Sequence, residues 1–174
     1  MKVILYLTII IGCYLLGNIF YTNTCNKLKL IYELKNFHND FIVKMNVYEI
    51  SIKKFYLSAN INCKNIIYSD INIIKKYMQQ NRNISVSDCI QKLYSENKFR
   101  LINENFKSSD IDIICSAYKT TEISDSKKAK DSINSLITWL DQKAQAIKEK
   151  EMTKVKLIKK NSVLIGVLTV LLMI

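Results

Sequence analysis

The most strongly patterned stretch of the sequence lies in its last third, where residues 129–147 read AKDSINSLITWLDQKAQAI. Its apolar side chains return every three or four residues, with lysine, aspartate and glutamine between them; they are Ala129, Ile133, Leu136, Ile137, Leu140, Ala144 and Ile147. Because an α-helix has 3.6 residues per turn, this spacing puts all of them on one face. The stretch therefore predicts an amphipathic helix of about five turns.

Apolar residues recur at the same spacing along much of the preceding chain. The groups are Leu28, Ile31 and Leu34; Phe41, Met45, Tyr48 and Ile52; Ile67, Ile71, Ile74 and Met78; Val86, Cys89, Ile90 and Leu93; and Ile113, Ile114 and Tyr118. Two groups follow a serine that has an aspartate three residues later, Ser85 with Asp88 and Ser109 with Asp112, and this spacing is typical of helix starts. The pattern predicts several helices joined by short connections.

Proline and glycine are almost absent, which favours helices over hairpins. The chain has no proline and three glycines, Gly12, Gly17 and Gly166, all in apolar segments near its two ends. β-Hairpins usually need an Asn-Gly or Asp-Gly turn, and the sequence contains neither. Amphipathic helices with short links pack as bundles, so an antiparallel helical bundle is expected.

The first apolar segment is long enough to cross a membrane. Residues Val3–Phe20 carry no charge, and a transmembrane helix needs about 20 apolar residues. Residues 1–21 are therefore predicted to be a transmembrane helix. A cleavable signal peptide and a lipoprotein leader are the alternatives, the second because Ile10–Cys13 resembles a bacterial lipobox.

The last apolar segment is shorter. Residues Asn161–Ile174 carry no charge, and as a helix they measure about 21 Å, less than the hydrocarbon core of about 30 Å. Snorkelling of the preceding lysines lengthens the segment, so residues 156–174 are predicted to be a second transmembrane helix. The alternative is a helix packed in a soluble core. Residues 22–155 form the predicted cytosolic bundle domain, and the predicted fold class is all-α.

Lysines are concentrated where the two apolar segments meet the middle domain. The formal net charge is +11, and cytoplasmic flanks of membrane helices carry an excess of lysine and arginine. The middle domain is therefore expected in the cytoplasm, with both termini on the opposite side. The lysines expected to contact anionic lipid headgroups are Lys27, Lys29, Lys154, Lys156, Lys159 and Lys160. A general bias of the sequence towards lysine is the alternative explanation of the positive charge. No nucleic-acid partner is expected, because no DNA- or RNA-binding motif is present.

No pattern in the sequence indicates catalysis, and the protein is not expected to be an enzyme. His38 is the only histidine, the middle domain has no glycine for a phosphate-binding loop, and Asp110 and Asp112 fit a helix start better than a metal site. The five cysteines lack Cys-x-x-Cys spacing and are expected to be reduced and mostly buried. No catalytic, cofactor-binding or metal-binding residue is therefore predicted. Trp139 is expected to be a core or bundle contact, with a partner-binding interface as the alternative.

The end of the sequence resembles the stage III sporulation protein AB family of endospore-forming bacteria. That family closes on a Lys-Met-Tyr-Arg-Ser-Leu-Gly-Val-Leu-x-Gly run followed by aliphatic residues, and residues 156–166 read KLIKKNSVLIG before VLTVLLMI. Upstream the family has Gly-x-x-Asp-x-x-x-Gln-x-x-x-Ile; Asp125 and Ile133 fit it, whereas Glu122 and Ala129 replace the Gly and the Gln. A Thr-Pro-Leu turn of the family is missing, with residues 50–52 near its place. The layout of two apolar ends around a helical domain matches over the whole length.

This resemblance implies a cytosolic domain similar to the helical bundles of the type II secretion platform protein. It also implies a place in a secretion-like complex in the mother-cell membrane around the forespore, where a platform would link a cytosolic ATPase to membrane partners. The expected partners are thus the membrane and other sporulation-complex proteins, with oligomerisation left open and no cofactor. The alternative function is a membrane-tethered helical scaffold unrelated to sporulation.

Overall fold

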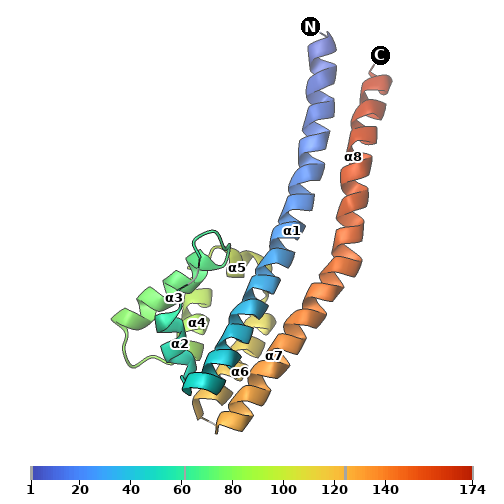
Figure 1. The fold of residues 1–174 in the computed structure, drawn as a ribbon. Helices are drawn as coiled ribbons and strands as arrows, with labels where there is room; N and C mark the ends of the chain where they lie inside the picture. Colours follow the sequence, from blue (N-terminus) through green and yellow to red (C-terminus); the bar gives the residue numbers. More distant parts are fainter. Residues whose placement is uncertain (1, 61, 124, 174) are drawn as a thin grey trace. The chain divides into compact units, whose positions relative to one another are not determined.

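The computed structural model describes residues 2–60, 62–123 and 125–173, and every regular element in these ranges is a helix (Figure 1). This confirms the all-α fold class. In chain order the elements are α1 (Lys2–Tyr48), α2 (Ile52–Ser58), α3 (Tyr68–Gln80), α4 (Val86–Ser95), α5 (Leu101–Asn105), α6 (Ser108–Ile123), α7 (Ser126–Ala146), η1 (Ile147–Glu151) and α8 (Met152–Leu172). Met1 and Ile174, the outer ends of the two predicted membrane segments, lie outside the described residues.

The chain divides into two compact units. The terminal unit consists of Met1–Lys29 and Lys143–Ile174, and the central unit of Leu30–Gln142. The boundaries predicted after residues 21 and 155 both fall inside the terminal unit, so the helices extend beyond the predicted membrane segments before this unit ends. Where the membrane begins along them stays a prediction.

The terminal unit is a pair of antiparallel helices, the first part of α1 and α8, with both chain ends at one end of the pair (Figure 1). At that end the Tyr6 hydroxyl donates a hydrogen bond of 3.5 Å to the Met173 carbonyl. Towards the other end the Lys27 ammonium lies 3.0 Å from the Glu151 carboxylate. The two apolar runs of the sequence are therefore paired along their lengths.

A five-residue π-helix, η1, keeps the buried face of this pair continuous. Ile147 and Val155 are both buried, although a separation of eight residues would rotate their side chains by about 80° in a regular α-helix. A π turn takes up one more residue than an α turn, so it returns both side chains to one face. That face continues along α8 through Ser162, Gly166 and Val170.

The central unit is a helical bundle with an aromatic cluster in its core. Phe37 and Phe41 of α1 pack on Phe55 of α2, with ring centroids 4.7 and 5.2 Å apart. The apolar stripes predicted for α3, α4 and α7 are confirmed as core; their buried members are Ile67, Ile71, Ile74, Met78, Val86, Cys89, Ile90, Leu93, Ala129, Ile133, Leu136 and Leu140. Ile113 was expected in the core and is 38% exposed, because α6 turns Ile111 and Ile114 inward instead.

Three carboxylates hold helix N-termini across the central unit. Glu33 of α1 accepts a hydrogen bond of 3.0 Å from the backbone amide before α3, and Glu122 of α6 accepts one of 2.8 Å from the first amide of α4. Asp70 of α3 is fully buried and accepts three, at 3.0–3.1 Å, from the start of α5. Helix N-termini carry unpaired N–H groups and partial positive charge, so these carboxylates fix which helix packs against which.

Local caps confirm one predicted helix start and shift another. The amide of Asp88 donates a hydrogen bond of 3.0 Å to the Ser85 hydroxyl, as the spacing predicts. The start of α6 uses Asp110 rather than Asp112: its carboxylate accepts a hydrogen bond of 2.8 Å from the Lys107 amide. Asp110 thus has the helix-start role expected of this aspartate pair.

Two turns that normally need glycine are made without it. Glu49, after α1, and Asn97, after α4, have positive φ angles of 52° and 53°. Glycine is preferred at this left-handed position and asparagine is the usual substitute, so Asn97 is an ordinary choice. Glutamate is not, because a longer side chain is disfavoured at positive φ. Glu49 is therefore the less favourable of the two.

Candidate functional site

Gly17 and Gly166 bring the two helices of the terminal unit into close contact. A side-chain carbon built on Gly17 would lie 2.9 Å from Cβ of Ser162 and 3.1 Å from the α8 backbone. One built on Gly166 would lie 3.1 Å from the α1 backbone and 3.3 Å from Cβ of Cys13. At Gly12, by contrast, it would meet nothing within 4 Å. Small residues four apart, as Ser162 and Gly166 are, are typical of packed membrane helices.

The other faces of this helix pair are apolar and exposed. Exposed residues of α1 are Ile4, Leu5, Leu7, Ile11, Tyr14, Leu15, Leu16, Ile19 and Phe20, and those of α8 are Leu157, Ile158, Val163, Leu164, Ile165, Val167, Leu168, Leu171 and Leu172. A solvated helix would carry polar residues on these faces. The pair is therefore built for apolar surroundings outside the small-residue contact.

Within the described ranges, α1 is the one helix that could cross a membrane by length and composition. Its most apolar window has a mean hydropathy of 1.9 and is only 6% buried. Helix α8 has a more polar first half, with Lys154, Lys156, Lys159 and Lys160. It nevertheless buries few residues, Val155, Ser162, Gly166 and Val170, which argues against the alternative of a helix packed in a soluble core.

The lysines predicted to contact lipid lie on both helices of the terminal unit. Lys27 is half-buried and pairs with Glu151 at 3.0 Å, so its charge already has a partner. The Lys159 ammonium lies 4.5 Å from the centre of the Tyr21 ring, a cation–π contact. The exposed members are Lys29, Lys154, Lys156 and Lys160. Contact of any of them with lipid stays a prediction.

A chain of three buried polar side chains crosses the central unit. His38 of α1 lies 2.6 Å (Nδ1) from the Leu34 carbonyl and 2.5 Å (Nε2) from the Tyr118 hydroxyl of α6, and Tyr118 lies 2.8 Å from the Tyr56 hydroxyl of α2. A neutral imidazole satisfies every group: Nδ1–H donates to Leu34, Nε2 accepts from Tyr118, and Tyr118 accepts from Tyr56. The chain links three helices.

Burial sets the protonation of this chain. Desolvation lowers the pKa of His38 from 6.5 to about 4, against the smaller raising effect of its hydrogen bond to Leu34. It also raises the pKa of Tyr56 and of Tyr118 well above 10. All three groups are therefore neutral near pH 7, and the cluster joins helices rather than carrying charge.

The cysteines are all free, as expected, but they are not mostly buried. Only Cys89 and Cys115 are buried, whereas Cys63 is exposed and Cys13 and Cys25 are intermediate. Desolvation raises the pKa of Cys89 to about 12 and that of Cys115 to about 11, so neither thiol is reactive near neutral pH. Cys63 is thus the accessible thiol of the central unit.

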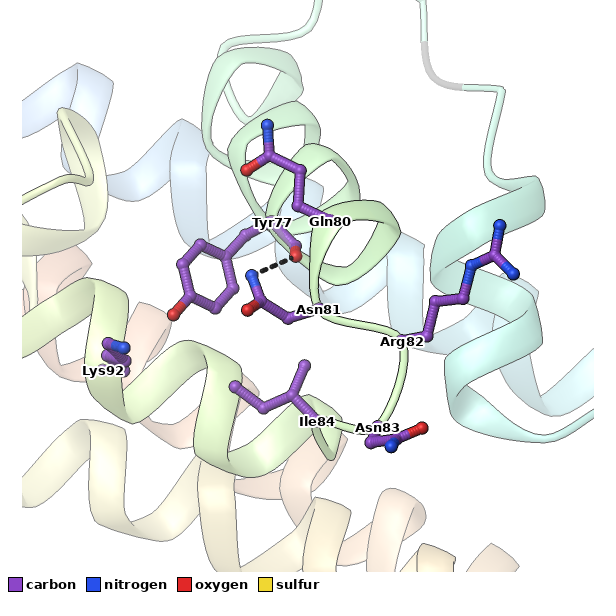
Figure 2. A pocket seen from close by; sticks show the side chains of 7 residues that line it. All are labelled: Tyr77, Gln80, Asn81, Arg82, Asn83, Ile84 and Lys92. Atoms are coloured by element: carbon purple, nitrogen blue, oxygen red, sulfur yellow. Dashed lines mark hydrogen bonds between the residues drawn. The ribbon is translucent and has the colours of Figure 1, made fainter.

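A shallow hollow opens where α3 ends and α4 begins (Figure 2), lined by Tyr77, Gln80, Asn81, Arg82, Asn83, Ile84 and Lys92. The Asn81 side chain donates a hydrogen bond of 3.0 Å to the Tyr77 carbonyl, and the Lys92 ammonium lies 5.5 Å from the Tyr77 ring centre. Lys53 donates to two loop carbonyls at 2.6 and 2.8 Å. These contacts hold the connection between α3 and α4 in place, and the hollow is the surface of that connection.

Trp139 is half-buried on α7. It lines a shallow surface hollow together with Asp131, Asn134, Ser135, Thr138 and Gln142. The indole is thus part packing contact and part surface, and its role as a partner interface stays a prediction.

Across the described ranges, no group of three or more His, Cys, Asp or Glu side chains is arranged to hold a metal ion.

The small-residue contact and the buried polar chain were not predicted from the sequence, for different reasons. The small-residue contact has a visible signal, the four-residue spacing of Cys13 with Gly17 and of Ser162 with Gly166. The buried polar chain has none, because Tyr118 is 80 residues from His38 and 62 from Tyr56. Only the folded bundle brings those three side chains together.

The chain was also compared with known proteins. The family model described as stage III sporulation protein AB matches residues 2–174. No curated protein and no solved structure matches the chain. The match covers both helices of the terminal unit and all of the central unit, so it does not depend on the apolar ends alone. The chain belongs to the stage III sporulation protein AB family, and its role is in sporulation.

Proposed function

We propose that this protein is a non-catalytic membrane platform of a secretion-like sporulation complex. Its terminal helices form a hairpin anchor in the mother-cell membrane, and its central unit lies in the cytoplasm, where it couples a cytosolic ATPase to membrane partners. The observation that carries the proposal is the contact of Gly17 with Ser162 and of Gly166 with Cys13 between helices whose other faces are apolar.

The pairing of the two helices supports a second membrane span despite its short apolar length. Gly166 lies beside Cys13, and Lys159 lies beside Tyr21. The uncharged part of α8 therefore runs level with the uncharged part of α1, and the charged parts begin at the same level. Local thinning of the bilayer costs only a fraction of a kcal/mol per Å, so α1 can hold its shorter partner across the membrane.

The chemistry of the central unit supports an adaptor rather than an enzyme. Its buried polar groups are used in structure: Asp70 caps α5 and His38 joins α1 to α6. Its outer surface is made of helix faces and short connections, which suit protein contacts. Trp139 is one candidate contact on that surface. Family membership favours this reading over a membrane-tethered scaffold unrelated to sporulation.

Disulfide trapping tests the hairpin. Native Cys13 is kept, the other four cysteines are replaced by serine, and Gly166→Cys is introduced. The Cβ atoms are 3.3 Å apart, close to the spacing of about 3.5–4.5 Å that a disulfide needs. Oxidation of membranes should give a faster-migrating, reducible monomer in high yield. The matched control moves the thiol by one residue (Gly12→Cys with Cys13→Ala) and should give little; equal yields from the two variants would rule out the hairpin.

Labelling of Cys63 tests the orientation. Cys63 is exposed, whereas Cys89 and Cys115 are buried with raised pKa values. With the partly exposed Cys13 and Cys25 changed to serine, a membrane-impermeant maleimide reports on Cys63 in the central unit. In intact cells of the native host Cys63 should stay unlabelled, and lysis should make it reactive. Labelling of intact cells to the same level as lysed cells would reject a cytoplasmic central unit.

A further inference from the structure

Within the terminal unit, α1 carries a second regular face beside the one that packs on α8. The face used in the hairpin passes through Cys13 and Gly17, which lie against Gly166 and Ser162. The second face starts one residue further along, about 100° around the helix; its members are Leu7, Ile11, Tyr14 and Asn18. They recur every four, three and four residues, which is the spacing of a seam between two packed helices. Leu7, Ile11 and Tyr14 are 54%, 54% and 45% exposed, so α8 leaves this face open.

Two polar side chains of the second face have no hydrogen-bond partner among the described residues. They are the hydroxyl of Tyr14 and the side-chain amide of Asn18. The threonines of the two uncharged runs differ, because Thr8 and Thr169 each donate to a backbone carbonyl of their own helix, at 2.7 and 2.8 Å. Polar groups in a membrane must be satisfied by protein, and they commonly bond across helices. The open hydroxyl and amide therefore indicate a neighbouring helix that one chain does not supply.

Tyr14 would lie where lipid offers its hydroxyl no partner. It is eleven residues from Val3 and six from Phe20, the ends of the uncharged run, which places it about 16 Å and about 9 Å from those two levels. Helix side chains lean towards the N-terminus, so the Tyr14 ring points away from the nearer boundary. Its hydroxyl is thus expected near the middle of a hydrocarbon core of about 30 Å.

We propose that the second face of α1 is a contact between two copies of this protein, with the Tyr14 hydroxyls of the copies hydrogen-bonded to each other inside the membrane. A phenol and an amide can each donate and accept, so a two-fold contact pairs Tyr14 with Tyr14 and Asn18 with Asn18. Copies inserted in the same orientation place these groups at the same depth, a match that any other membrane protein would need to supply separately. The inference rests on the proposed function, because it needs α1 in the membrane, and it adds a partner for the anchor.

Cysteine crosslinking tests this contact in membranes of the native host. In the full-length chain the five native cysteines are changed to serine, Ile11→Cys is introduced, and two copies with different tags are expressed together. Oxidation should give a reducible dimer that carries both tags. The matched control is Leu16→Cys, because Leu16 is 60% exposed but lies about 140° around the helix from Ile11, and it should give little dimer. Equal yields at the two positions, or an adduct of one copy with a different protein, would overturn the proposal.

Substitutions of the polar groups identify what holds the two copies together. Tyr14→Phe removes only the hydroxyl and should lower the yield of the Ile11→Cys dimer about three- to tenfold. Asn18→Leu should also lower it. Thr8→Val removes a hydroxyl that is already bonded within α1 and should leave the yield unchanged. A dimer as abundant with Tyr14→Phe as with Tyr14 would refute the contact.

The disulfide between Cys13 and Gly166→Cys distinguishes failure of this inference from failure of the proposed function. It should form equally well with Tyr14 and with Tyr14→Phe, so a loss of dimer cannot come from a loss of the hairpin. A trapped hairpin without an Ile11→Cys dimer removes the contact between copies and leaves the anchored platform. Failure to trap the hairpin removes both.

Discussion

At the scale of single residues, several buried polar side chains of the central unit join its helices. His38, Tyr118 and Tyr56 form one hydrogen-bonded chain, and the buried Asp70 caps α5. A buried polar group without a partner costs about 1–3 kcal/mol, so such groups tie a specific set of helices together. Neither arrangement is encoded locally, since each partner comes from a distant part of the chain.

Buried His38 makes stability depend on pH. Its pKa is about 4 in the folded protein and 6.5 in the unfolded chain, so between these values the unfolded state binds more protons. The contribution of His38 to the free energy of unfolding should be fully present above pH 6.5 and fall by about 3 kcal/mol as the pH drops to 4. Urea unfolding of the full chain in detergent, followed by Trp139 fluorescence, measures this. His38→Gln should remove that part of the slope, and an unchanged slope in the variant would contradict a neutral buried imidazole.

At the scale of helices, apolar periodicity located α3, α4 and the long α7, because each buries one regular stripe against the core. It did not separate α2 from α1, or find α5, which has five residues. Helices of five to seven residues have at most two turns, too few to show a repeating apolar stripe, and they are held by tertiary contacts instead. The π segment η1 was also beyond prediction, since only packing on both sides of it reveals the extra residue.

The glycines of α1 give a matched test of helix packing. Gly17→Ala places a carbon 2.9 Å from Cβ of Ser162, a clash that α8 can relieve only by moving away, at a cost of about 1–3 kcal/mol. Gly12→Ala meets nothing within 4 Å and should leave packing intact. Trapping of Cys13 with Gly166→Cys should therefore fall severalfold in the first variant and stay constant in the second. Equal trapping in both would mean that Gly17 is not a packing point.

At the scale of the whole molecule, the positive charge is unevenly divided. The terminal unit has ten lysines and only two acidic residues, Glu149 and Glu151, which gives it +8 of the net +11. The central unit, with nearly twice the residues, carries +3. Nine of the ten lysines lie in residues 22–29 and 143–160, between the uncharged runs and the central unit, whereas a general bias towards lysine would spread them evenly. The sequence therefore places the charge as a membrane flank would require, which composition alone could not reveal.

This division predicts which lysines orient the anchor. Changing Lys154, Lys156, Lys159 and Lys160 to glutamine leaves the Lys27–Glu151 pair intact and removes headgroup attraction worth about 1 kcal/mol per lysine. A fraction of the molecules should then retain their C-terminal end in the cytoplasm, measured as loss of external labelling of Met173→Cys in a background without other cysteines. The matched control removes equal charge from exposed positions of the central unit, as Lys64, Lys76, Lys98 and Lys119 to glutamine, and should keep full labelling. The control should differ because the positive-inside effect acts only near the ends of a membrane helix. If both sets lower labelling equally, the total charge directs insertion and the position of the lysines does not.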